Sequence, residues 1–191
     1  IGRYTRSVIA ELAAGNPQLE IVCLLNGSYG DDTRALVEEL AASIKGANGN
    51  SNSDKDIPHK DVSNKDAFMS DAAIKGAATK CTAIKGVTLE YVQCYLPSPT
   101  GAYHPANLVR ESLAELLREA FIRELEPDLV HVFSLMEGYA DNVVTSIGRL
   151  TVDYPVTATF YDLIPLLNPE EYLHTNVAFA RHYEDKLASL K

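Results

Sequence analysis

Short runs of consecutive apolar residues alternate along this chain with longer segments in which apolar residues recur every three or four positions. The runs are rich in valine, leucine, isoleucine and aromatic residues, and glycine, proline, asparagine or aspartate lies beside them. This pattern is typical of buried β-strands. The sequence therefore predicts four strands, at 19–25, 87–96, 129–133 and 156–160.

The longer segments predict helices, at 4–14, 31–44, 107–125, 140–150 and 170–190. Strands that alternate with helices form βαβ units, in which the strands are parallel and helices cover the sheet. The predicted fold class is therefore α/β, with the four strands parallel in one sheet. Because the first helix has no strand before it, we expect a strand ahead of Ile1 that this sequence does not include.

Residues 46–86 have a different composition. This stretch is rich in asparagine, serine, aspartate, lysine and alanine, and most of it lacks aliphatic periodicity. Such a segment offers little apolar surface to offset the entropic cost of ordering it. We interpret the chain as a single domain, residues 1–191, with a mobile insertion at about 47–80. This interpretation allows for a short helix within the insertion, near 67–78, and a functional flap is the alternative.

Charge and cysteine content exclude several classes of function. The formal net charge of −9 argues against a nucleic-acid partner, because such a partner requires a basic surface. No apolar run reaches the ~18 residues of a membrane-spanning helix. Cys23, Cys81 and Cys94 have neither an even count nor CxxC spacing, so the sequence predicts no disulfide framework and no metal site. A reducing, cytoplasmic setting agrees with this cysteine usage.

Gly2, Arg3 and Tyr4 lie at the start of the first predicted helix. Glycine allows a phosphate close to the backbone, and the free N–H groups of a helix start attract anions. An ordinary helix entry is the alternative for these three residues.

Two further groups of polar residues follow predicted strands. Glu137, Gly138, Asp141 and Asn142 come after the strand at 129–133, where carboxylate and amide groups are able to bind sugar hydroxyls. Capping of the next helix is the equally weighted alternative. Tyr161 and Asp162 follow the strand at 156–160, at the edge where open α/β sheets bind ligands; Asp162 has helix capping as its alternative.

Three segments together resemble one enzyme family. They are Ile1-Gly2-Arg3-Tyr4-Thr5, then Pro127-Asp128-Leu129-Val130-His131-Val132 with Glu137-Gly138, and Thr159 to Pro169. They are similar to the glycine loop, the central strand and the His-Asp-Leu-Ile-Pro-Leu segment of family-4 glycosyltransferases of the GT-B architecture. The nearest likeness is to bacterial mannosyltransferase-like members that build surface polysaccharides.

The resemblance implies a Rossmann-like three-layer domain with a parallel sheet, which is one half of a GT-B enzyme. The family's N-terminal domain holds the acceptor and its C-terminal domain holds the nucleotide sugar. Transfer retains the anomeric configuration and uses no cofactor and generally no metal. By this likeness Gly2, Arg3 and Tyr4 bind the donor phosphates, and the 137–142 residues named above bind the acceptor. Tyr161 and Asp162 are then the catalytic candidates.

One position departs from the family pattern. Tyr161 replaces the family's histidine, and a tyrosine donates a hydrogen bond but does not carry a positive charge near neutral pH. We expect Tyr161 to keep a contact with the sugar. We do not expect it to perform a role that requires a protonated histidine.

The resemblance also implies a function for the parent enzyme. It would transfer a hexose, with mannose as a candidate, from a nucleotide diphosphate sugar such as GDP-mannose to a glycan acceptor. We expect it in the cytoplasm, with peripheral contact at the inner face of the membrane. The donor domain is expected to be absent from this chain, which alone would then be inactive. The alternative is a non-enzymatic, flavodoxin-like binding or interaction module.

Overall fold

The computed structural model describes residues 2–16, 18–26, 35, 39, 42, 80–84, 87–150, 153–161 and 163–190. They fall into two compact units. The N-terminal unit comprises Gly2–Tyr95, and the C-terminal unit comprises Leu96–Lys191 together with Ile1.

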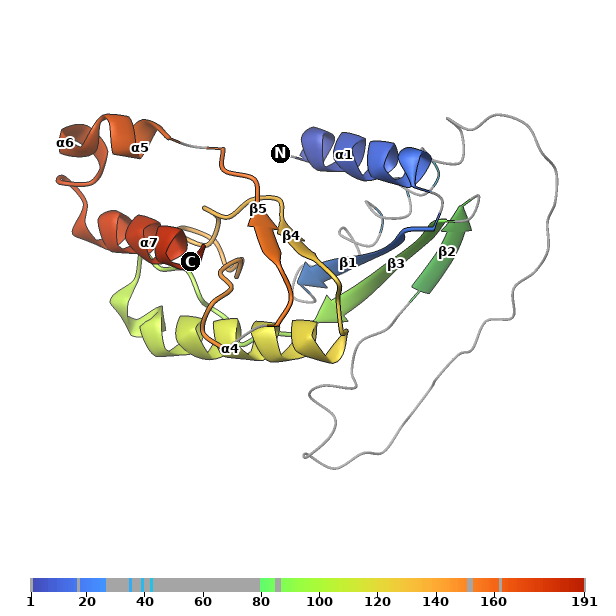
Figure 1. Ribbon diagram of the computed structural model, residues 1–191. Coiled ribbons are helices and arrows are strands. Elements are labelled where there is room, and N and C mark those ends of the chain that lie inside the picture. Colours follow the sequence, from blue (N-terminus) through green and yellow to red (C-terminus); the bar gives the residue numbers. More distant parts are fainter. Residues whose placement is uncertain are drawn as a thin grey trace, which may run out of the picture. The chain divides into compact units, whose positions relative to one another are not determined.

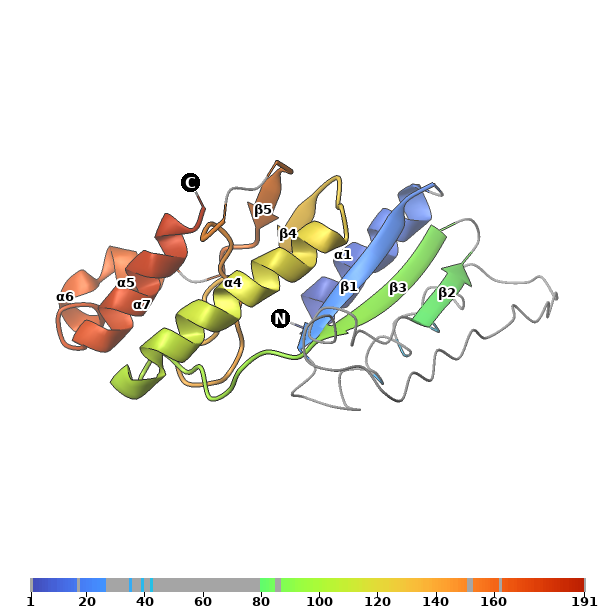
Figure 2. The ribbon, with the colours of Figure 1, turned by 90° about the horizontal axis from the view of Figure 1, so that it is seen from below.

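A three-stranded sheet and a helix form the described part of the N-terminal unit. Strand β1 (Glu20–Asn26) pairs with β3 (Val87–Cys94) in parallel, and β2 (Lys80–Ile84) pairs with the other edge of β3 in antiparallel orientation. Helix α1 (Gly2–Gly15) lies across one face of this sheet (Figures 1 and 2). The buried core of the unit combines helix and strand side chains: Ile9, Ala13, Leu89, Tyr91, Val92 and Cys94.

Strand β2 was not predicted from the sequence, which places most of it in the polar stretch. The strand is only five residues long, and its β-branched residues Thr82 and Ile84 are separated by Ala83, which is depleted in strands, so the local strand signal is weak. The strand gains its hydrogen bonds by extending the edge of a sheet already built by β1 and β3. Residues 47–79, and with them the expected insertion, lie outside the described residues, as does most of the helix predicted at 31–44.

Two parallel strands and a set of helices form the C-terminal unit. Strand β4 (Val130–Val132) pairs with β5 (Val156–Ala158). The 3₁₀ turn η2 (Pro105–Asn107) leads into helix α4 (Leu108–Glu124), and the chain closes with α5 (Ile164–Leu167), α6 (Pro169–Tyr172) and α7 (Val177–Ala188). The single helix predicted at 170–190 is thus divided. Asn176 begins α7 by accepting a 3.1 Å hydrogen bond from the Phe179 N–H.

The predicted strands and their parallel pairing are confirmed within each unit, β1 with β3 and β4 with β5. The described strands form two hydrogen-bonded sheets rather than the single predicted sheet. The chain therefore combines helices with small parallel sheets, which is compatible with the α/β class. No helix among the described residues has both the length and the apolar character needed to cross a bilayer.

The helix predicted at 140–150 is wrong. This stretch is irregular and belongs to the 134–150 loop, which we define as residues 134 to 150. Val143, Val144 and Thr145 are β-branched, which disfavours a helix. Gly148 has φ +134°, outside the range open to other residues. Side chains from α4 and α7 bind the backbone and hydroxyl groups of this loop, as described below.

Helix α4 is confirmed, but most of the leucines that recur along it at helical spacing do not face the core. Leu113, Leu116, Leu117 and Leu125 are exposed. The face that is buried carries Ala114, Glu115, Glu119, Phe121 and Ile122. Two carboxylates thus take core positions, and such burial requires partners for their charge.

Candidate functional site

The chain leaves strands β4 and β5 at the same edge of their sheet. Because these strands are parallel, the 134–150 loop and the segment after Ala158 both leave from their carboxyl ends. Tyr161 lies in that segment with 42% of its surface exposed. Asp162 lies outside the described residues, so its catalytic role stays a prediction.

Glu137 is partly buried in this loop, and Gly138 beside it is buried. One carboxylate oxygen of Glu137 accepts a 3.0 Å hydrogen bond from the Ser134 hydroxyl, and the side chain is only partly buried. Gly138 has φ +100°, and a Cβ atom at this position would collide with the carbonyl oxygen of Val143. The glycine is therefore required by the loop itself, whatever it binds.

Asp141 and Asn142 hold the loop in shape. Asp141 Oδ1 accepts from the Val143 N–H at 2.8 Å, and Asn142 Oδ1 accepts from the Thr100 N–H at 2.8 Å. Both side chains accept hydrogen bonds from backbone N–H groups, as helix-capping residues do, but no helix follows them. Acceptor binding by Asp141 and Asn142 stays a prediction.

The loop is joined to residues 100–103 by its backbone as well. Ala102 N–H donates to the Gly138 carbonyl at 3.0 Å, and Tyr103 N–H donates to the Tyr139 carbonyl at 2.9 Å. Together with the Asn142 bond, these contacts make a short ladder between the two segments. The ladder restricts the conformation of the predicted acceptor residues before any ligand binds.

An aromatic cluster on α7 packs against the same loop. The ring centroids of Tyr139 and Phe179 lie 5.1 Å apart in an edge-to-face arrangement, and Asn176 Nδ2 donates to the Tyr139 hydroxyl at 2.9 Å. His182 is buried, with its Nε2 3.2 Å from the Met136 carbonyl. Burial, followed by the nearby Lys186 charge, lowers the pKa of His182 below its usual value, which favours the neutral ring near pH 7.

This α7 face was missed because the segment reads as polar overall. A signal was nevertheless present. Phe179, His182, Tyr183 and Lys186 have the i, i+3, i+4, i+7 spacing of one helix face, and the last three are buried.

A buried carboxylate holds the second half of the loop. Glu119 of α4 is fully buried. Its Oε1 accepts from the Gly148 and Arg149 N–H groups at 2.7 and 2.8 Å, and its Oε2 accepts from the Leu150 N–H at 2.5 Å. Three successive backbone donors are thus satisfied by one side chain rather than by a helix.

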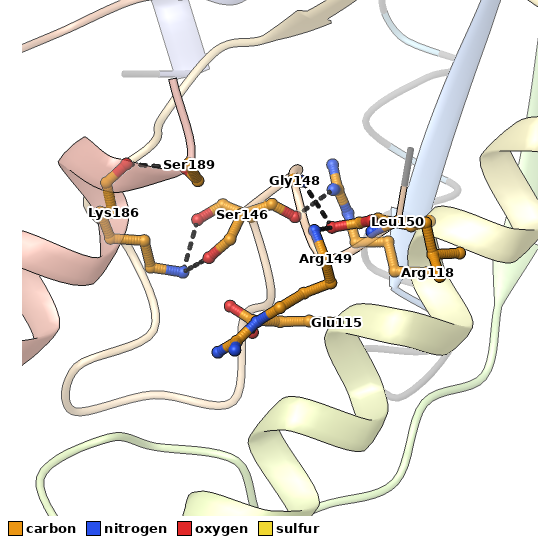
Figure 3. A network of polar contacts seen from close by, with 10 residues as sticks. Glu115, Arg118, Ser146, Gly148, Arg149, Leu150, Lys186 and Ser189 are labelled. Atoms are coloured by element: carbon orange, nitrogen blue, oxygen red, sulfur yellow. Dashed lines mark hydrogen bonds and ion pairs between the residues drawn. The ribbon is translucent and has the colours of Figure 1, made fainter. Parts of the chain in front are cut away.

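Two cations complete this network. Lys186 of α7, which is 2% exposed, donates to the Thr145 and Ser146 hydroxyls at 3.0 and 2.8 Å (Figure 3). Burial lowers the pKa of Lys186 to about 8, against the opposing effect of Glu115 and other acidic groups. Arg118 of α4 donates to the Ser146 carbonyl at 3.1 Å.

The remaining charged pair joins α4 to the loop. Arg149 Nε donates to Glu115 Oε2 at 2.7 Å, and this bond raises the pKa of the guanidinium. Glu115 is 4% exposed, so Arg149 is the partner that makes its burial tolerable. Burial and the neighbouring Glu115 raise the pKa of Glu111 on the same helix face.

The remaining predicted residues lie in the other unit. Helix α1 begins at Gly2, as expected, and Tyr4 in its first turn is 47% exposed. The side chain of Arg3 lies outside the described residues. Convergence of Gly2, Arg3 and Tyr4 with the 134–150 loop therefore stays a prediction.

His131 of β4 is exposed, and both of its ring nitrogens have a hydrogen-bond partner. Its two ring nitrogens lie 2.8 and 3.0 Å from the hydroxyls of Thr157 and Thr159. In the described part of the chain, no group of three or more His, Cys, Asp or Glu side chains is placed to hold a metal ion.

The chain is similar to proteins of Escherichia coli named serotype-specific mannosyltransferase WbdA. Two of them are 36% identical to it and a third is 35% identical, each over 94 residues. The matched segment makes up 49% of this chain and 11% of each relative, so it spans about a tenth of their length. No protein-family model matches the chain, and no solved structure matches it significantly. The predicted likeness to bacterial mannosyltransferases is therefore confirmed.

Proposed function

We propose that this chain is the acceptor-side, Rossmann-like domain of a retaining GT-B glycosyltransferase. The enzyme would move a hexose, with mannose from GDP-mannose as the first candidate, to a growing glycan on the cytoplasmic side of the membrane. The observation that carries this proposal is the 36% identity over 94 residues to proteins named mannosyltransferases. The parallel β4–β5 pair, with polar residues after both strands, supports a ligand site at that edge.

The roles assigned to the site residues follow from the family resemblance. Gly2, Arg3 and Tyr4 are proposed to face the donor phosphates, and Glu137, Gly138, Asp141 and Asn142 to contact the acceptor. Tyr161 and Asp162 are proposed to contact the transferred sugar. Stabilising the departing nucleotide diphosphate would be the main electrostatic task of the complete enzyme.

The first experiment tests the enzyme as a whole. The full-length protein would be incubated with a panel of nucleotide sugars and a synthetic mannoside acceptor, and the product would be examined by NMR for its anomeric configuration. We expect transfer of mannose with retention. This chain alone should give no turnover, because the proposal places donor binding mainly outside the 191 residues. Clear transfer by the isolated chain, or none by the full-length protein, would contradict the proposal.

The second experiment tests the residues. In the full-length enzyme, Tyr161→Ala and Asp162→Ala should lower kcat, whereas Glu137→Ala should mainly raise KM for the acceptor. Tyr172→Ala is a matched control, since Tyr172 of α6 is 39% exposed, close to the value for Tyr161. Near-normal kinetics in all three site variants would refute the assigned roles.

A further inference from the structure

A small polar cleft opens between α4, the 134–150 loop and the end of α7. We call it the Arg149 cleft. It has a volume of about 160 Å³, and its lining includes Glu115, Ser146, Gly148, Arg149, Asp185 and Ser189. All of these residues belong to the C-terminal unit, and none was among the site residues predicted from the sequence.

The cleft presents hydrogen-bonding groups that the described protein leaves unused. The Arg149 side chain is 48% exposed, and only its Nε is bonded, to Glu115. Among the described residues, neither terminal nitrogen of this guanidinium has a partner, and they carry four N–H donors. Glu115 Oε1 and the exposed Asp185 carboxylate also have no hydrogen-bond donor among the described residues.

The balance of charge selects against ions. An anion would meet the Glu115 and Asp185 carboxylates, and a cation would meet the Arg149 guanidinium with the Lys186 ammonium behind it. A neutral ligand with several hydroxyls avoids both penalties, because each hydroxyl accepts from a guanidinium N–H and donates to a carboxylate. At about 160 Å³ the cleft is smaller than the ~300–1,000 Å³ of drug-sized pockets. It therefore fits one sugar ring rather than an oligosaccharide.

The groups that line the cleft are also held in place before a ligand binds. Glu119 binds the backbone N–H groups of Gly148 and Arg149, so the segment that bears the guanidinium is held by α4. Lys186 holds the Ser146 hydroxyl oxygen, which leaves the hydroxyl proton available for a ligand. A site with fixed donors loses little entropy when its ligand binds.

We propose that the Arg149 cleft is a saccharide subsite that binds one pyranose unit of the glycan acceptor, away from the residue that is extended. The Arg149 guanidinium donates to adjacent sugar hydroxyls, and Asp185 accepts from them at the rim. This subsite rests on the proposed function, since it assumes a glycan acceptor.

The test is an NMR titration of the ¹⁵N-labelled chain with methyl α-D-mannopyranoside up to about 100 mM, a range that detects millimolar affinity. We expect saturable shifts of the Gly148 and Arg149 amides and of the Arg149 side-chain Nε–H. Arg149→Gln and Asp185→Asn should each weaken binding about fivefold or more, equivalent to about 1 kcal/mol. Asp185 is exposed, so its variant keeps the test valid if Arg149→Gln fails to fold. Arg181→Gln, at an exposed α7 position outside the cleft, is the control and should bind as wild type.

Several outcomes would overturn the subsite. These are the absence of shifts at Gly148 and Arg149, unchanged affinity in both cleft variants, or shifts caused by inorganic phosphate and not by the mannoside. In the full-length enzyme, Asp185→Asn should raise KM for an oligosaccharide acceptor but not for a nucleotide sugar. Normal transfer with unchanged acceptor KM would refute the subsite and leave the proposed function standing. Absence of transfer by the wild-type enzyme would refute the proposed function instead.

Discussion

Helix α4 and the 134–150 loop satisfy their backbone groups in opposite ways. The helix bonds to itself over Leu108–Glu124, so its backbone needs few outside partners. The loop takes backbone partners from side chains far away in the sequence, above all Glu119 and Arg118. Lys186 adds hydrogen bonds to two of its hydroxyl groups. The comparison teaches that α4 has two functions. It is a helix by local preference, and its buried carboxylates are a template for the loop beside it.

The same comparison explains where polar chemistry gathers in this unit. An irregular segment keeps carbonyl and N–H groups that a helix would hide, and charged residues are buried to meet them. The Arg149 cleft and the predicted acceptor residues both lie on this segment. Loops of this kind, held by a rigid scaffold, are the usual place for binding residues.

The largest expected effect comes from removing the charged acceptor in α4. Glu119→Gln keeps the size of the side chain but turns an N–H donor toward the loop donors. We expect a loss of about 3–5 kcal/mol in the free energy of unfolding, because hydrogen bonds to a buried charge are lost together. Urea unfolding followed by circular dichroism measures this. Glu124→Gln, at an exposed position of the same helix, should change stability by less than about 0.5 kcal/mol. Equal effects of the two variants would mean that α4 does not serve as a template.

A second test uses pH to remove the charge of Lys186, which α7 buries beside the loop. The pKa of Lys186 is lowered from 10.5 to about 8 in the folded protein. Between these values the unfolded chain binds more protons at this site, so the free energy of unfolding should rise with pH there, by about 3 kcal/mol in total. The cost of burying the charge is fully present below pH 8.

Lys186→Met lacks this titration and provides the comparison. The stability difference between wild type and variant, measured by urea unfolding from pH 7 to 10.5, should shift in favour of wild type across the window. A constant difference over the whole range would show that the ammonium group is not buried as described.

A third test concerns the backbone conformation that the loop requires at Gly138. Gly138→Ala should cost about 1–3 kcal/mol, because φ +100° is unfavourable for alanine and the new methyl group meets the Val143 carbonyl. Gly15→Ala, at the end of α1 where no atom lies within 4 Å of a new Cβ, should be neutral or slightly stabilising. Thermal unfolding of both variants decides the matter, and a stable Gly138→Ala protein would contradict the loop geometry.

The smallest effect tests whether Asn142 is structural or only binds ligand. Asn142→Ala removes the acceptor for the Thr100 N–H and should cost about 1 kcal/mol, the usual net value of one hydrogen bond. Asn142→Asp retains an acceptor and should cost less. Chemical denaturation of the ligand-free chain separates the two roles, because loss of a purely ligand-binding side chain would leave this stability unchanged.

The sequence by itself determined the elements whose signal is local. The spacing in α1 and α4 and the short apolar runs of β1, β3, β4 and β5 gave their types and approximate places, since each depends on residues within one segment. The motifs at 1–5, 127–138 and 159–169 likewise sufficed to identify the mannosyltransferase likeness. None of these conclusions required knowledge of which segments meet.

Tertiary structure alone decided the rest. The spacing of apolar residues in segment 140–150 predicts a helix, yet the segment is irregular. Glu119, some 30 residues earlier in the chain, binds the backbone N–H groups at its end. Glu115, Glu119 and Lys186 look like solvated residues until their partners are known, since burying a charge is tolerable only beside an opposite charge or several hydrogen bonds. Strand β2 forms because an edge of β3 is open to it. In each case the stabilising contact joins residues distant in sequence, and a pattern read along the chain does not contain it.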